Sequence, residues 1–121
     1  MMIVVMDERP ETLRVLRMTL EAQGHHVSES RNANDALALL RRNSMKTSLI
    51  ISSLDIDDGI SLLQEVRADH ELRDIPFVGM SADSSPTLRD DSFALGADAY
   101  LPKPLKFDAL RSVIANLGVP A

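Results

Sequence analysis

Short apolar runs alternate with amphipathic helical patterns five times along this 121-residue chain. The apolar runs are continuous, which is typical of strands in a parallel sheet that is covered on both faces. Apolar residues at the i, i+3, i+4 spacing of a helix follow the runs. This alternation predicts one α/β domain spanning residues 1–121, with a doubly wound, five-stranded parallel sheet and five helices.

The expected elements can be placed by residue number. Strands are expected at 3–6, 25–30, 48–53, 75–80 and 97–101, and the second has the weakest pattern. Helices are expected from Pro10 to about Gly24, through 33–40 and 59–66, and over 87–95 and 107–117. The 87–95 helix has a poor apolar stripe, so we expect it to be the least firmly docked.

Charge and composition exclude several classes of protein. The chain carries 13 Lys and Arg against 18 Asp and Glu, and the net charge of −5 disfavours direct binding of nucleic acid. No apolar run reaches the roughly 20 residues of a membrane span, and the turn to acidic residues at Asp7 excludes a signal peptide. The absence of cysteine removes thiolate catalysis and fits a reducing compartment. We therefore expect a cytoplasmic protein that binds neither nucleic acid nor membrane.

Polar residues follow the expected strands at their carboxyl ends, where open parallel sheets bind their ligands. The first strand ends at Asp7 and Glu8, and a pair of carboxylates can hold Mg²⁺. Ser53, Ser81 and Lys103 lie at the ends of the third, fourth and fifth strands. Taken singly, these are ordinary loop acids, turn serines and a surface lysine. Taken together, they are predicted to converge at one edge of the sheet.

This combination resembles the receiver domain of bacterial two-component response regulators over nearly the whole chain. The segment LGADAYLPKPLKFDAL carries the strongest similarity, supported by VVMDERPETL, DGISLLQEVR and IPFVGMSAD. The resemblance implies a flavodoxin-like (CheY-like) fold with strand order 2-1-3-4-5. It further implies that Ser81 contacts a phosphoryl group, that Lys103 is the family's lysine and that Tyr100 is its aromatic switch residue. Asp7 and Glu8 would take the positions of the metal pocket.

The end of the third strand departs from the family. A receiver has an aspartate there, which becomes an acyl phosphate, whereas this chain has Ser53, and the loop from Ser53 to Gly59 is shorter than usual. A serine hydroxyl is protonated at neutral pH and needs an adjacent base. His25, His26 and His70 are expected at the surface, away from the strand ends. Without the third carboxylate, the Mg²⁺ site is expected to be weak or lost.

Asp55 is the fallback acceptor, because it lies two residues beyond Ser53 and shares its face if the strand continues. Two functions therefore stay open. The first is a degenerate receiver, not an enzyme, that acts through protein–protein contacts without aspartyl phosphorylation. The second is a phosphorylatable receiver that uses Asp55, with Mg²⁺ held by Asp7 and Glu8. Asp57 and Asp58 are expected to cap the third helix.

Partners follow from the resemblance. It implies contact with a sensor kinase, an output domain or another signalling protein through the face formed by the fourth helix, fifth strand and fifth helix, and this face could also support a homodimer. A flavin-binding flavodoxin is rejected, because the loop MDERP offers acids and a proline where a phosphate needs backbone donors. A hydrolase is rejected, because no nucleophile, base and orienting acid converge.

Overall fold

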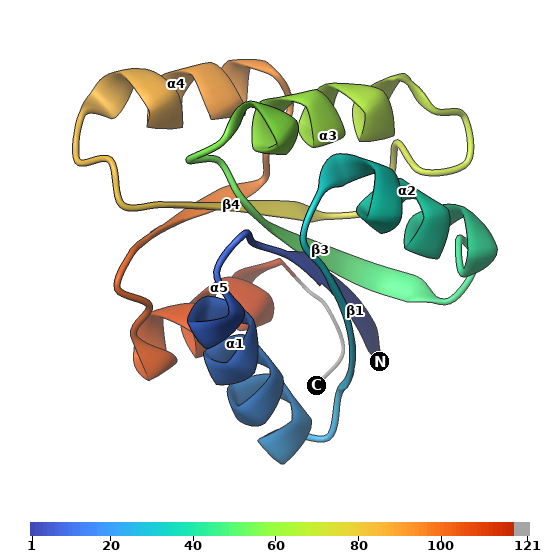
Figure 1. Ribbon diagram of the computed structural model, residues 1–121, viewed down its shortest axis with the longest axis horizontal. Coiled ribbons are helices and arrows are strands. Elements are labelled where there is room, and N and C mark those ends of the chain that lie inside the picture. The colour runs from blue at the N-terminus through green and yellow to red at the C-terminus, as the bar shows by residue number, and fades with distance from the viewer. Residues whose placement is uncertain (118–121) are drawn as a thin grey trace.

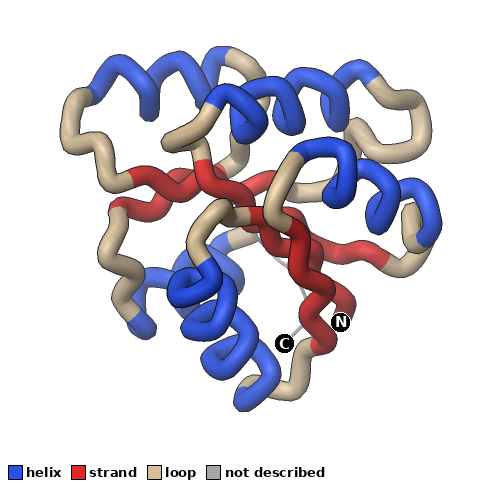
Figure 2. Tube along the Cα trace, in the orientation of Figure 1, coloured by secondary structure: helices blue, strands red, loops and turns tan. Residues whose placement is uncertain are grey.

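The computed structural model describes residues 1–117, apart from the side chain of residue 57, and strands and helices alternate along the whole of this range (Figures 1 and 2). Residues 118–121 of the expected domain lie outside it. The strands are β1 (Met2–Met6), β2 (His26–Ser30), β3 (Thr47–Ser53), β4 (Phe77–Ser81) and β5 (Ala99–Pro102). The helices are α1 (Pro10–Ala22), α2 (Ala33–Arg42), α3 (Asp57–Ala68), α4 (Pro86–Ala94) and α5 (Phe107–Asn116).

The sheet has the strand order β2-β1-β3-β4-β5, and every neighbouring pair is parallel, which confirms the predicted topology. Helices α2, α3 and α4 lie on one face of the sheet and α1 and α5 on the other (Figure 1). Successive residues of a strand point to opposite faces. Val4 and Met6 therefore join the core under α2 and α3, whereas Ile3 and Val5 join the core under α1 and α5. This two-sided burial explains why the strands are continuously apolar.

Helix α4 is the least buried of the helices, in agreement with its poor apolar stripe. Only Ser92 of this helix is buried, while Phe93 is 44% exposed. Leu88 packs against the core only partly. The weak packing makes α4 the helix least firmly held by the core.

The beginning of α3 differs from the prediction. The residue before the helix is Ile56, and no side chain caps the helix. The expectation that Asp58 caps α3 is wrong, because its carboxylate accepts a hydrogen bond from the Ala33 N–H at 3.0 Å and so serves the start of α2. The side chain of Asp57 lies outside the described part of the chain.

Arg67 of α3 joins the amino-terminal side of the sheet to the loops around it. Its guanidinium donates to the carbonyls of Gly96 and Ile75 and pairs with Asp98 at 2.9 Å. The same Asp98 oxygen accepts from the Phe77 N–H at 2.9 Å. These contacts hold the segments before β4 and β5 in place, at the amino-terminal edge of the sheet and away from the polar cluster at its carboxyl edge.

His25 is buried, with 4% of its surface exposed, so the expectation that it lies at the surface is wrong. Burial, and then the nearby N-terminal ammonium, lower the pKa of His25. Its Nδ1 has no hydrogen-bond partner within residues 1–117. His26 and His70 are exposed, as expected. No helix within the described range is both long and apolar enough to cross a bilayer.

Candidate functional site

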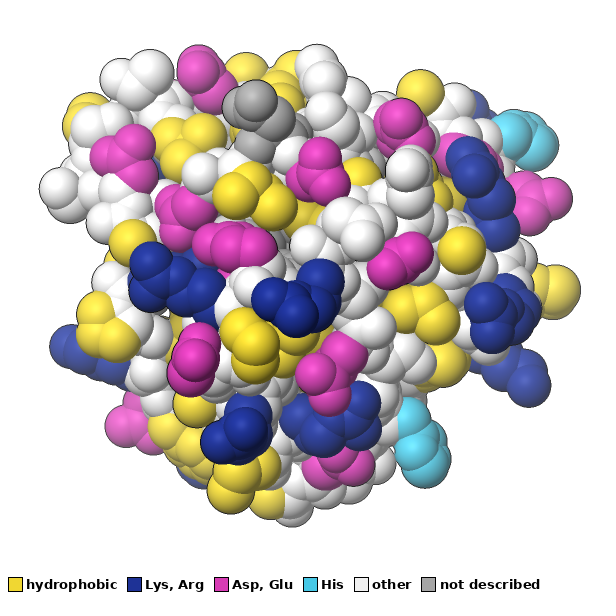
Figure 3. All heavy atoms as spheres, viewed as in Figure 1, with side chains coloured by type: hydrophobic (Ala, Val, Ile, Leu, Met, Phe, Trp, Pro, Cys, Tyr) yellow, Lys and Arg dark blue, Asp and Glu magenta, His cyan; other side chains and the backbone are white. Residues whose placement is uncertain are grey.

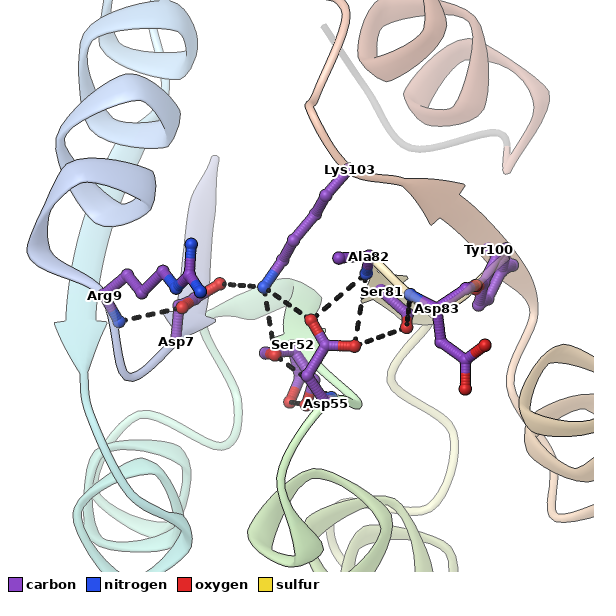
Figure 4. Close-up of polar contacts among 10 residues, drawn as sticks. Asp7, Arg9, Ser52, Asp55, Ser81, Ala82, Asp83, Tyr100 and Lys103 are labelled. Carbon is purple, nitrogen blue, oxygen red and sulfur yellow. Dashed lines mark hydrogen bonds and ion pairs between the residues drawn. The ribbon is translucent and has the colours of Figure 1, made fainter. Parts of the chain in front are cut away.

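The strand ends bring polar side chains together at one edge of the sheet (Figure 4). The parallel register places Met6 beside Ser52 and Ser53 beside Met80, so β1, β3 and β4 end at the same level. Asp7, Ser53, Ser81 and Lys103 converge there as the strand-end rule predicts. Glu8 lies beside them in sequence, and its Oε2 is buried without a hydrogen-bond partner in the described range.

Lys103 provides the cation at the centre of the site. It follows β5 and precedes a cis peptide bond to Pro104. Its Nζ lies 2.9 Å from Oδ2 of Asp7, 3.1 Å from Oδ2 of Asp55 and 3.2 Å from Oγ of Ser53. Burial acts to lower the pKa of Lys103, but hydrogen bonds and charge attraction from Asp7 and Asp55 raise it above its ordinary value. The ammonium is therefore a fixed positive charge at neutral pH.

Asp55 reaches into this site although β3 has already ended at Ser53. Its Oδ1 accepts from the Ser81 hydroxyl, both of its oxygens lie 3.2 Å from the Ala82 N–H, and Oδ2 accepts from Lys103. Partial burial acts to raise the pKa of Asp55, but these donors outweigh it and lower the pKa below its ordinary value. Asp55 is thus an ionised carboxylate held by three donors.

The Ser53 hydroxyl is fully buried below Asp55. Its Oγ accepts from the Lys103 ammonium and, at 3.3 Å, from the Asp55 N–H. Within residues 1–117 this hydroxyl donates to no carboxylate. The site therefore supplies Ser53 with donors and no general base.

A chain of hydrogen bonds connects the site to the surface beside α4. Ser81 Oγ also accepts from the Asp83 N–H at 2.9 Å, and the Asp83 carbonyl accepts from the Tyr100 hydroxyl at 3.1 Å. Tyr100 is half-buried and lines a shallow hollow of about 510 Å³ together with Arg89 and Phe93. A change in the position of Ser81 would therefore alter the hydrogen bond of the Tyr100 hydroxyl through Asp83.

Three features of the site were not predicted from the sequence. Asp55 enters from a loop rather than from a continued strand, and the Ala82 N–H and Asp83 carbonyl are main-chain groups that no residue type reveals. The position of Ala82 and Asp83 directly after β4 was the available signal, because the strand-end rule applies to backbone groups as well. The premise that β3 must continue for Asp55 to reach the site is wrong.

The donor set for a metal ion is small. Asp7 is fully buried, its Oδ1 accepts from the Arg9 N–H at 2.9 Å, and its Oδ2 pairs with Lys103. Within the described range no three histidine or acidic side chains form a group that could hold a metal ion. Mg²⁺ prefers several oxygen ligands in near-octahedral geometry. The protein side of such a site is limited to the carboxylates of Asp7 and Glu8, and Asp7 already pairs with Lys103.

The fold and its strand-end cluster of acids, hydroxyls and a lysine define a flavodoxin-like α/β domain with a charged pocket. The sequence profile of the response regulator receiver domain matches residues 3–115. The chain belongs to the family of response regulator receiver domains of two-component signalling. These domains are signalling modules, and they commonly bind Mg²⁺ at their phosphorylation site.

Individual relatives agree with this assignment. The two-component response regulator ARR10 of Arabidopsis thaliana is 33% identical over 115 residues, which cover 93% of this chain but 20% of that protein. The transcriptional regulatory protein SrrA of Staphylococcus aureus is 29% identical over 84% of this chain and 41% of its own length. The matched region thus covers less than half of the length of either relative. The chemotaxis response regulator CheY4 of Vibrio cholerae superposes with a TM-score of 0.86 at 20% identity, covering 96% of this chain and 97% of its own, and shows the shared fold.

Proposed function

We propose that this chain is an atypical receiver domain that signals through protein–protein contacts without conventional aspartyl phosphorylation. The observation that carries the proposal is Ser53. It is the last residue of β3, it is fully buried, and Lys103 contacts it directly. By resemblance to the family, this is the position of the aspartate that becomes phosphorylated.

Serine cannot take over that chemistry in this setting. A serine nucleophile needs a base that accepts its proton as it attacks phosphorus. The Ser53 oxygen instead accepts hydrogen bonds from an ammonium and an amide, and both withdraw electron density from it. Its complete burial also keeps it from a phosphodonor. We therefore assign Ser53 a structural role, and the domain a role as a binding module rather than an enzyme.

A second candidate function uses Asp55 as the phospho-acceptor. It is favoured by the contacts of Asp55 with Ser81 and Lys103, the two residues that the resemblance expects to hold a phosphoryl group. The same contacts weigh against it. Both carboxylate oxygens are already saturated by donors that a phosphoryl group would need, so phosphorylation would first have to displace Asp55 from its own partners.

We propose that the Mg²⁺ site is weak or lost in the first function, whereas the second would need Mg²⁺ held by Asp7 and Glu8. Only Asp7 and Glu8 supply carboxylates on the β1 side, and the Lys103 ammonium already neutralises Asp7 at 2.9 Å. A divalent cation would be repelled by this fixed positive charge.

The proposed partner is another signalling protein, such as a sensor kinase or an output domain, bound through the α4–β5–α5 face. Phe93 of α4 is 44% exposed there, beside Tyr100 of β5, and a second copy of the chain is an alternative occupant. Acidic and basic side chains are interspersed on the face that Figure 3 shows, which does not favour a polyanion such as nucleic acid. We place this function in the cytoplasm.

Intact-mass spectrometry after incubation with acetyl phosphate and Mg²⁺ tests the proposal. Wild type is expected to keep its mass. Ser53→Asp, which restores a carboxylate at the end of β3, is expected to gain one phosphoryl group in part of the molecules. If wild type gains a phosphoryl group and Asp55→Asn does not, the second candidate function is correct and the proposed one is wrong.

A further inference from the structure

We infer that the Asp55 carboxylate is a built-in substitute for a phosphoryl group, which holds Ser81, the Ala82 N–H and Lys103 together and fixes the α4–β5 face in one signalling conformation. This inference rests on the proposed function, because an acceptor that is never phosphorylated leaves these donors without their usual ligand. It concerns what replaces the phosphoryl group within the chain itself.

Three donors of different kinds point at one volume. A hydroxyl comes from Ser81, a main-chain N–H from Ala82 and an ammonium from Lys103. Such a set is suited to an anion with several oxygens, because each donor can address a different lone pair. The Asp55 carboxylate occupies that volume and is the acceptor for all three donors. An external anion would have to compete with it.

The loop after β3 is built to bring Asp55 to this place. The Leu54 N–H donates to the Met80 carbonyl at 2.7 Å, which extends the pairing with β4 by one residue beyond the strand. The Leu54 side chain is buried, and it fits because Gly79 has no Cβ: an added Cβ would lie 2.4 Å from Leu54 Cδ1. Leu54 therefore anchors the chain, and the next residue is directed toward Ser81.

Ser53 and Asp55 act as a pair in this arrangement. The Ser53 Oγ accepts from the Asp55 N–H and supports the main chain of the residue that carries the carboxylate. Because the Ser53 side chain is small, the Asp55 carboxylate, two residues further along the chain, can occupy the space next to it. A carboxylate at position 53 would lie against Asp7 and Asp55 with one lysine to neutralise all three. Serine at 53 is therefore required for Asp55 to hold its place.

The effect reaches the partner face through the main chain. Ser81 is held by Asp55 on one side and by the Asp83 N–H on the other, and the Asp83 carbonyl holds the Tyr100 hydroxyl (Figure 4). A ligand shifts a conformational equilibrium only through different affinities for its states. Here the ligand is covalently part of the chain, so its effective concentration is high and constant. The conformation of the domain is then set by its sequence and not by a phosphodonor.

Tyr100 is the single tyrosine of the chain, so ring-labelled tyrosine gives one NMR reporter for this state. In wild type we expect one ring signal without relaxation dispersion, unchanged by beryllium fluoride with Mg²⁺. In Asp55→Ala we expect the signal to shift or broaden by exchange, together with the amides of α4 and β5. Inorganic phosphate added to Asp55→Ala should return the signal toward its wild-type position in a saturable manner. In this variant the Ser81 hydroxyl, the Ala82 N–H and the Lys103 ammonium are free to bind an added anion.

Glu11→Ala is the matched control, because Glu11 lines the same hollow as Asp55 and its replacement removes the same charge. It should leave the Tyr100 signal unchanged. If Asp55→Ala does not fold by circular dichroism, Asp55→Asn, which keeps the shape and loses the charge, is measured with the same reporter in its place. A folded variant at position 55 with the wild-type Tyr100 signal overturns the inference. That failure is distinct from failure of the proposed function, which would appear as a gain of mass with acetyl phosphate.

Discussion

Replacing Gly59 with alanine should destabilise the domain, although the same change inside most helices is stabilising. Alanine is favoured over glycine by about 1 kcal/mol in a helix interior. Gly59, however, is in the first turn of α3, where the helix lies directly against the end of β3. A Cβ added there would lie 1.9 Å from the Ser53 carbonyl oxygen and 2.9 Å from Leu54 Cα.

The size of the effect follows from what must move. A Cβ contact under 3.0 Å is essentially never found, so the helix and the Ser53–Leu54 backbone must separate by roughly 1 Å. Overpacking of this kind typically costs about 1–3 kcal/mol, and contact with backbone places Gly59→Ala at the upper end. After the helix preference is subtracted, we expect a net loss of about 2 kcal/mol in the free energy of unfolding. For a domain of this size, this lowers Tm by roughly 6–10 °C.

Urea unfolding and thermal melting followed by far-UV circular dichroism measure this loss. Ser61→Ala is the matched control, because Ser61 is exposed on the same helix and gains only helix preference. The displaced loop should also disturb Asp55, so the Tyr100 signal should shift in Gly59→Ala and stay fixed in Ser61→Ala. If Gly59→Ala is as stable as Ser61→Ala, the close approach of α3 to the end of β3 is wrong.

Two further predictions concern the rest of the fold. The lowered pKa of His25 means that the unfolded state binds the proton more readily, so the free energy of unfolding should fall as pH drops below about 6.5, by at most about 1.4 kcal/mol per pH unit. Urea midpoints measured from pH 8 to 5 should show this pH dependence in wild type and in the control His26→Gln, but not in His25→Gln. If His25→Gln keeps the same pH dependence, other titratable groups cause it. Arg67→Ala should cost about 2–4 kcal/mol, because it removes the guanidinium that pairs with Asp98 and donates to three carbonyls. Equal stability of Arg67→Ala and Arg41→Ala, a largely exposed arginine, would contradict the role of this network.

The fold itself was determined by local sequence patterns. Continuous apolar runs and helical spacing are repeated within short windows, and the parallel sheet follows because each strand must be buried on both faces. The positions of Asp7, Ser53, Ser81 and Lys103 were predictable for the same reason, since residues that end parallel strands meet at one edge.

The tertiary structure alone decided where the loop side chains go. Asp55 reaches Ser81 because Leu54 pairs with Met80 of a distant strand, and no local pattern encodes that pairing. Asp58 serves α2 rather than its own helix because α2 begins beside it in space. His25 is buried, and the hollow that it lines is shared with Ile114 and Ala115 of α5, far along the chain. A loop residue is free of strand and helix periodicity, so its surroundings are set by long-range packing, and at this site that packing determines which carboxylate meets the lysine.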